Sequence, residues 1–201
     1  AAALVAAQAA VCIFLLFGAA LFVGTLQRLQ SRPLGFTPDN LLHLSVESAG
    51  SRSREEWAQL LAAIRQLPRV ESAAVAGWAP LTGNRWRVSV TVPGQPSRED
   101  APNWVAVWPG YFETMRMRLM EGRDFRAEDR APAKDDTGRP VPGVAIVNEA
   151  FARVYFGGRN PIGRRVTVDH LKASMEIVGM AADAVYFSVR EAAHPGVFVP
   201  Q

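Results

Sequence analysis

A run of 27 residues without a charged side chain opens the chain, and it constrains the fold more than any other feature. Residues 1–27 contain no Asp, Glu, Lys, Arg or His, and 22 of them are Ala, Val, Leu, Ile, Phe or Cys. As a helix, this run is about 40 Å long, against a hydrocarbon core of about 30 Å. We therefore predict a transmembrane anchor helix with a short stalk over residues 1–30. The side chains expected to contact lipid are those of Val11, Phe14, Leu15, Phe17, Leu21 and Phe22.

Two other interpretations of this run fit less well. A cleaved signal peptide has a shorter apolar region, about 7–15 residues, followed by a cleavage site between small residues. Here the densest apolar part continues without such a site into Thr25-Leu26-Gln27-Arg28. A buried helix that is apolar on every face needs a thick protein shell, which the remaining residues cannot easily provide. The flanking Arg28 and Arg32, taken alone, slightly favour a cytoplasmic domain, but the opposite flank is absent and the orientation stays open.

The rest of the chain has the composition of an ordinary water-soluble domain. All 22 basic and 19 acidic side chains lie after residue 27, and no second charge-free run approaches the length of a span. Cys12 is the only cysteine and lies in the apolar run, so a disulfide framework is excluded. The chain begins with Ala and ends in a strand-like Val-Phe-Val-Pro-Gln, so we expect it to be a piece of a longer protein.

Short strands and short helices alternate after residue 35. Period-two alternation and short apolar runs predict strands at 41–46, 70–76, 86–92, 104–107, 144–147, 165–168 and 175–178. A capping box formed by Ser53 and Glu56 predicts a helix up to Leu67. This helix and the strands on either side of it form a β-α-β unit, which needs a further strand elsewhere in the sheet. These elements predict an α+β domain of two lobes.

Two more helices are predicted in the second half of the soluble part. Phe112, Met115 and Leu119 mark a short amphipathic helix. Asn148 is placed to cap a helix whose core face includes Phe151. Residues 127–143 are rich in Pro, Gly, Asp and Lys, which predicts a loop.

The polar residues give no pattern of catalysis or of ligand binding. The three histidines are far apart and lack the spacing of metal ligands. No nucleophile motif is present, and the glycine-rich stretch at 157–163 follows a helix, which favours a tight turn over a phosphate loop. The basic residues are almost all arginines, spread among nearly as many acids, which is unlike a nucleic-acid surface. We predict no catalytic residue, cofactor, metal site or nucleic-acid partner.

Short motifs spread along almost the whole chain follow one another in the same order as in one known protein family. The apolar helix leads into Gly35-Phe36-Thr37-Pro38-Asp39-Asn40, and later come Pro109-Gly110-Tyr111-Phe112, Gly122-Arg123-Asp124-Phe125, Val147-Asn148, Pro161-Ile162-Gly163 and Val178-Gly179. Together they resemble the MacB-like periplasmic core domain of ABC-transporter permeases, of the FtsX-like and acidobacterial duplicated type. A departure is Met180-Ala181-Ala182-Asp183, which replaces a more valine-rich run.

The resemblance implies a first transmembrane helix followed by a two-lobed periplasmic domain. Residues 36–98 would form the first part of a lobe similar to efflux-pump porter modules, 99–190 a small α/β lobe, and 191–201 the start of the return to the first lobe. The motif residues Gly35, Phe36, Gly122, Arg123, Phe125, Asn148, Pro161, Ile162, Gly163 and Gly179 would have structural roles. We expect Gly122, Gly163 and Gly179 to serve turns or close backbone approaches, and Arg123 to pair with Asp124 or Asp129.

The resemblance also implies partners and a place in the cell. The partners would be the lipid bilayer, further transmembrane helices of the same chain, a cytoplasmic ABC ATPase, a periplasmic adaptor and a second permease subunit. The protein would lie in the bacterial inner membrane, with residues after about 30 in the periplasm. There it would relay ATP-driven motion to export or efflux of a substrate that the sequence does not identify, without being an enzyme. The alternatives are a membrane-tethered periplasmic enzyme and a passive interaction module.

Overall fold

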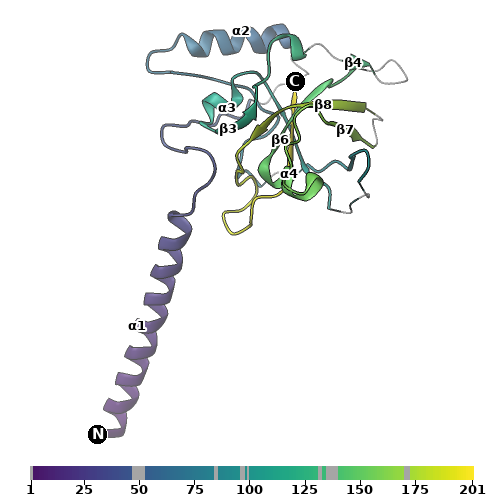
Figure 1. Cartoon of the computed structure of the whole chain (residues 1–201). Helices are drawn as coiled ribbons and strands as arrows, with labels where there is room; N and C mark the ends of the chain where they lie inside the picture. Colours follow the sequence, from purple (N-terminus) through teal and green to yellow (C-terminus); the bar gives the residue numbers. More distant parts are fainter. Residues whose placement is uncertain are drawn as a thin grey trace. The chain divides into compact units, whose positions relative to one another are not determined.

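The computed structural model describes residues 2–46, 53–83, 86–95, 98, 100–130, 133–134, 140–169 and 173–201. The chain forms two compact units, Ala1–Pro33 and Leu34–Gln201 (Figure 1). The first unit consists mainly of helix α1 (Ala2–Gln30), all of whose residues are at least partly exposed. By length and composition, α1 could cross a membrane. Its apolar side chains surround the helix on every side, as expected of a helix in contact with lipid.

The second unit is organised around one sheet of seven strands. The strands follow the order β1-β7-β8-β6-β9-β2, and β3 pairs with β8 beside this path. Their bounds are β1 (Val90–Thr91), β2 (Asn103–Val107), β3 (Leu119–Gly122), β6 (Val144–Asn148), β7 (Arg165–Val168), β8 (Ala173–Ala181) and β9 (Gly196–Pro200). A separate pair, β4 (Ala133–Lys134) and β5 (Pro140–Val141), lies outside this sheet. The sheet is mixed, since β6 runs parallel to β8 and antiparallel to β9.

The long strand β8 organises the sheet. Along one edge it pairs with β6 in parallel. Its other edge is shared by two antiparallel strands, with β7 beside residues 173–176 and β3 beside residues 179–181. The pairing of β6 with β8 shifts register between Ala145 and Ile146, where a bulge is accommodated.

Apolar clusters cover both faces of the sheet, because side chains along a strand alternate between its faces. On one face, α4 (Glu149–Phe156) packs Phe151 and Tyr155 against strand residues such as Val197. On the other face, Phe198 meets Tyr111 and Phe112 of the short helix α3 (Tyr111–Thr114). The sheet residues of β6 and β9 are therefore buried almost throughout.

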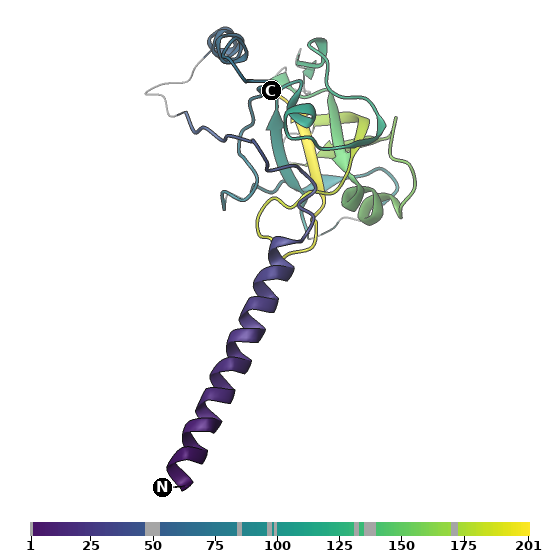
Figure 2. The same cartoon turned by 90° about the vertical axis from the view of Figure 1, so that its left-hand side faces the viewer.

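Local sequence signals explain where two of the helices begin. Helix α2 (Arg54–Arg65) is capped at its start by Ser53, which forms the predicted capping box with Glu56. Helix α4 is capped at its start by Asn148, whose side chain accepts the amide of Phe151, and at its end by Gly157 in the left-handed conformation. Figure 2 shows α2 and the loop between β8 and β9 at opposite ends of the second unit. A turn of 3-10 helix, Glu128–Arg130, lies in the predicted loop.

Three predicted elements are wrong in detail. Residues 42–46 are exposed and pair with no strand among the described residues, although their alternation predicts one. A strand needs a partner for its backbone groups, and alternation alone does not supply it. Residues 70–75 form no ladder, and only Ala76 makes a single bridge, to Val107. The helix predicted through Leu119 ends at Thr114, because Leu119 pairs with Ala181 and starts β3.

The remaining predicted strands are present, and the chain has the predicted α+β fold class after an N-terminal apolar helix. The alternation at 86–92 buries Val88, Val90 and Val92, although only residues 90–91 form a ladder. Strand β1 from the first predicted lobe pairs with β7 from the second, so a single sheet joins both. The lobe boundaries at 98 and 190 stay predictions.

Candidate functional site

The segment that directly follows α1 is bound to the core of the second unit. The carbonyl of Leu34 accepts the amide of Val185 at 2.8 Å, and the amide of Thr37 donates to the carbonyl of Met115 at 3.1 Å. Between them, Phe36 packs against the apolar cluster around Phe198. Only three residues separate the end of α1 from Leu34. We call residues 34–37 the docking segment.

Gly35 is required where the docking segment crosses the loop between β8 and β9. Its φ is +80°, in the left-handed region that glycine adopts without cost. A Cβ at this position would overlap the carbonyl oxygen of Asp183 and lie 2.6 Å from the Cα of Ala184. Both neighbours are backbone atoms and cannot rotate away. The close approach at Gly35 therefore leaves no room for a side chain.

Asp183 connects this contact to the start of α4. Its carboxylate accepts the amide of Ala150 at 2.7 Å and a guanidinium hydrogen bond from Arg153 at 2.5 Å. Its own amide donates to the carboxylate of Glu149 at 3.1 Å. A carboxylate at the first turn of a helix pairs with otherwise unsatisfied amides and with the positive end of the helix dipole. Asp183 therefore contacts Gly35 through its backbone and the first turn of α4 through its carboxylate.

Asn148 joins three segments in a buried position, with 4% of its surface exposed. Its side-chain oxygen accepts the amides of Phe151 at 3.0 Å and of Gly196 at 2.8 Å. Its side-chain nitrogen donates to the carbonyl of His194 at 2.9 Å. The side-chain amide of Asn148 therefore holds the end of β6, the first turn of α4 and the start of β9 together.

The loop between β8 and β9, residues 182–195, also contacts the opposite face of the sheet. The hydroxyls of Tyr186 and Tyr111 are 2.9 Å apart, and the carbonyl of Tyr186 accepts the amide of Leu81 at 2.7 Å. Burial raises the pKa of Tyr111 to about 12, although its hydrogen bond with Tyr186 opposes the shift. Burial also raises the pKa of Tyr186. Both hydroxyls are therefore protonated at neutral pH, and the bond between them is neutral.

The motif Gly122-Arg123-Asp124-Phe125 fixes the end of β3. A Cβ on Gly122 would lie 2.8 Å from the Cα of Gly179, so two motif glycines let β3 and β8 approach closely. Phe125 is buried in the apolar cluster beneath. Arg123 pairs with Asp129, one of its two predicted partners, through hydrogen bonds of 2.5 and 3.0 Å. Only 9% of the Asp129 side chain is exposed to solvent. The sequence alone did not predict this burial.

The hydrogen bonds from Arg123 lower the pKa of Asp129, while burial raises the pKa of Asp124. A lowered pKa means that ionised Asp129 stabilises the folded state above the unfolded pKa of about 3.9, and that this gain is lost as the pH falls through the folded pKa. For Asp124 the sign is reversed: because its folded pKa is raised, protonation of this carboxyl at low pH stabilises the folded state.

Asp129→Asn is expected to lower the free energy of unfolding by about 1.5 kcal/mol at neutral pH, the lower end for hydrogen bonds to charged groups, because Arg123 is partly exposed. The difference from the unmodified protein should shrink below about pH 4, which thermal unfolding across a pH series measures. A difference that stays constant down to low pH would contradict the role of the ion pair. Asp39→Asn, at an exposed carboxylate, is the control.

The motif Pro161-Ile162-Gly163 forms a turn before β7. The amide of Gly163 donates to the carbonyl of Ile177 at 2.8 Å, and its φ of +75° favours glycine. Ile162 packs against the apolar cluster beneath α4. The side chain of Asn160 accepts the amide of Ile162 and also contacts Glu121 of β3. These contacts connect the turn to β8 through Ile177 and to β3 through Glu121.

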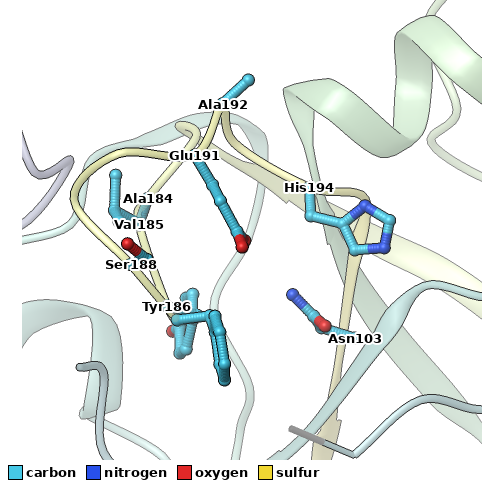
Figure 3. A pocket seen from close by; sticks show the side chains of 9 residues that line it. Asn103, Ala184, Val185, Tyr186, Ser188, Glu191, Ala192 and His194 are labelled. Atoms are coloured by element: carbon cyan, nitrogen blue, oxygen red, sulfur yellow. The ribbon is translucent and has the colours of Figure 1, made fainter. Parts of the chain in front are cut away.

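The described part of the chain has a small polar hollow beside the loop 182–195. It is lined by Asn103, Ser188, Glu191 and His194 among others (Figure 3). Its cavity volume of about 10 Å³ matches a single water molecule. In the same described residues, no group of three or more His, Cys, Asp or Glu side chains could hold a metal ion. The candidate site is the junction of the docking segment, Asp183 and Asn148, where the contacts described above meet.

Part of this junction had a sequence signal and part had none. Gly35 and Phe36 belong to the quoted motifs, and Asn148 was expected as a helix cap. Its bonds to residues 194 and 196 were not foreseen, because they join positions almost fifty residues apart. Asp183 lies in the stretch that departs from the family pattern, and nothing in the local sequence marks it as a partner of Ala150 and Arg153.

Comparisons with known proteins place this arrangement in a family. The model of the MacB-like periplasmic core domain matches residues 2–201. No curated protein matches the chain. Among solved structures, the periplasmic region of MacB from Actinobacillus actinomycetemcomitans is 14% identical with a TM-score of 0.43, and the match covers 70% of this chain and 61% of that one.

Two further solved structures are similar to the same extent. The extracellular domain of the noncanonical ABC-type transporter YknZ from Gram-positive bacteria is 14% identical, with a TM-score of 0.43 and coverage of 71% of this chain and 60% of that one. A domain of a permease protein from Porphyromonas gingivalis is 16% identical, with a TM-score of 0.43 and coverage of 69% and 54%. The chain thus spans somewhat more than half of the length of these structures. The match of the family model over nearly every residue shows that the chain belongs to the MacB-like periplasmic core domain family, found in permease-type proteins of ABC transporters.

Proposed function

We propose that this chain is the first transmembrane helix and periplasmic core domain of a permease subunit in a MacB- or FtsX-type ABC system of the bacterial inner membrane. The subunit has no catalytic activity of its own. A cytoplasmic ATPase supplies the energy, and further transmembrane helices of the same chain, a periplasmic adaptor and a second permease subunit complete the assembly. The domain relays ATP-driven motion to the export or efflux of a substrate.

The observation that carries this proposal is the docking segment. Residues 31–33 leave little slack between α1 and Leu34, and the two backbone hydrogen bonds of residues 34–37 bind this segment to the core. From Gly35 the path continues through Asp183 to α4, and from Phe36 into the cluster around α3. Coupling between two sites needs such packed elements, which move together between discrete arrangements.

Lengthening the connection between α1 and the docking segment should abolish this coupling. We would insert Gly-Ser-Gly-Ser between Arg32 and Pro33 of the full-length permease, reconstituted in nanodiscs with its ATPase. Hydrogen exchange should then show no ATP-dependent change in residues 34–37 and 182–188, while ATP hydrolysis continues, because a flexible linker absorbs the displacement. The same insertion after Gly94, in a turn with open space around it, is the matched control. ATP-dependent changes that survive the first insertion would overturn the relay.

The side of the membrane is tested separately. Glu55 is exposed on α2, so Glu55→Cys in a cysteine-free background provides a label site without disturbing the core. A membrane-impermeant maleimide should modify this cysteine in intact spheroplasts. Modification only after lysis would place the domain in the cytoplasm and refute the proposed localisation.

A further inference from the structure

His194, near the end of the loop 182–195, lies close to an acidic side chain from a distant segment. Its ring nitrogen Nε2 is 3.5 Å from a carboxylate oxygen of Asp100, which precedes β2. Only 19% of the His194 side chain is exposed to solvent, and the Nε2 atom itself is buried. At this distance a neutral imidazole gains little from a carboxylate, whereas a protonated imidazole forms an ion pair with it.

The backbone around His194 is fixed by hydrogen bonds on both sides of the ring. The carbonyl of His194 accepts a hydrogen bond from the side chain of Asn148 at 2.9 Å, and the amide of Gly196 donates to the same side chain at 2.8 Å. Between them, the carbonyl of Pro195 accepts the amide of Asn103 at 2.8 Å. Protonation therefore changes the charge at a position that the fold has already set.

Asp100 is held in place from two directions. The guanidinium of Arg87 donates to the carboxylate oxygen that also faces His194, at 3.1 Å. The hydroxyl of Tyr155, on α4, donates to the backbone carbonyl of Asp100 at 3.1 Å. The positive charge of Arg87 weakens the attraction of this carboxylate for a second cation, and 67% of the Asp100 side chain is exposed. An ion pair with His194 is therefore expected to be modest in strength.

A second carboxylate faces the same ring from within the loop. Glu191 and His194 line the hollow beside the loop, and Figure 3 shows the Glu191 carboxylate directed into it. A protonated ring thus has acidic side chains on two sides, Asp100 from the segment before β2 and Glu191 from the loop, against the single guanidinium of Arg87.

From these contacts we infer that protonated His194 forms an ion pair with Asp100 and so fastens the loop 182–195 to the segment before β2 at mildly acidic pH. A histidine that gains an acidic partner on folding contributes stability that is complete below its unfolded pKa of about 6.5 and is lost as the pH rises through the folded value. The loop should therefore be held more firmly at about pH 5.5 than at pH 8. The inference concerns contacts within the second unit and does not depend on the proposed function.

Hydrogen exchange of the full-length protein tests this pH dependence. The protection factors of the amides in residues 188–194, which correct for the intrinsic effect of pH on exchange, should be about two- to fivefold higher at pH 5.5 than at pH 8, the range of an ion pair with one exposed partner. His194→Gln should abolish the difference, and Asp100→Asn should remove most of it. His43→Gln, at an exposed histidine of the same chain, is the matched control and should leave the difference unchanged.

Each other outcome overturns the inference. Protection that is equal at the two pH values, or higher at pH 8, would mean that protonation of His194 does not fasten the loop. A difference that survives His194→Gln would assign it to another group, and one that survives Asp100→Asn in full would exclude this ion pair. Melting temperatures at pH 8, where the ion pair is absent, check that the variants are folded. Asp100→Asn keeps the test decisive if His194→Gln unfolds, because Asp100 is mostly exposed.

Discussion

Replacing Gly35 by valine is expected to lower the free energy of unfolding of the second unit by about 2–5 kcal/mol. Overpacking against fixed atoms costs about 1–3 kcal/mol, and a left-handed backbone adds about 1–2 kcal/mol for a residue with a Cβ. Both terms apply, since φ is +80° and the neighbours are the backbone of Asp183 and Ala184. Thermal unfolding of the full-length permease, followed by tryptophan fluorescence, measures the loss.

Gly94 offers a matched control for this substitution. Its φ of +79° equals that of Gly35 almost to the degree, but no atom lies within 4 Å of the position that its Cβ would occupy. Gly94→Val should therefore show the backbone term alone, about 1–2 kcal/mol. Equal losses for the two variants would mean that the docking segment does not press on the loop 182–195, and the relay would lose its structural basis.

The second large effect is expected for Asn148→Leu, with a loss of about 3–5 kcal/mol. Leucine leaves the amides of Phe151 and Gly196 and the carbonyl of His194 without their side-chain partner in a buried position. Each buried polar group left unsatisfied costs about 1–3 kcal/mol. Asn148→Ser should lose less, because a hydroxyl can still cap α4. The measurement is again thermal unfolding of the full-length protein.

The control for Asn148 is Asn160→Leu, at an exposed residue that also accepts a backbone amide, from Ile162. Water can replace that side chain, so we expect a loss of about 1 kcal/mol or less. If the three variants had the same stability, Asn148 would be an ordinary helix cap, and the connection between β6, α4 and β9 would not depend on it.

Local sequence patterns correctly predicted those elements that depend mainly on residues close together in the sequence. The apolar run of α1, the capping box of α2 and the cap of α4 are local signals, and each helix begins where its signal lies. The alternation of Trp86, Val88, Val90 and Val92 correctly predicted the burial of the three valines, but Trp86 is 62% exposed. The same kind of alternation at 42–46 was misleading. An alternating pattern indicates which side chains could be buried, but it does not show whether another strand is available to pair with the backbone.

The amino-acid sequence by itself determined the division into an apolar helix and a charged domain, the α+β class, and the motif order of the family. These follow from hydrophobicity and local backbone preference, which act over a few residues. Only the tertiary structure decided what the motifs do together. The pressing of Gly35 on Asp183, the three bonds of Asn148 and the choice of Asp129 over Asp124 by Arg123 depend on how distant segments pack. Each of these contacts joins residues that only the packing of the complete domain brings together, so no local pattern in the sequence can predict it.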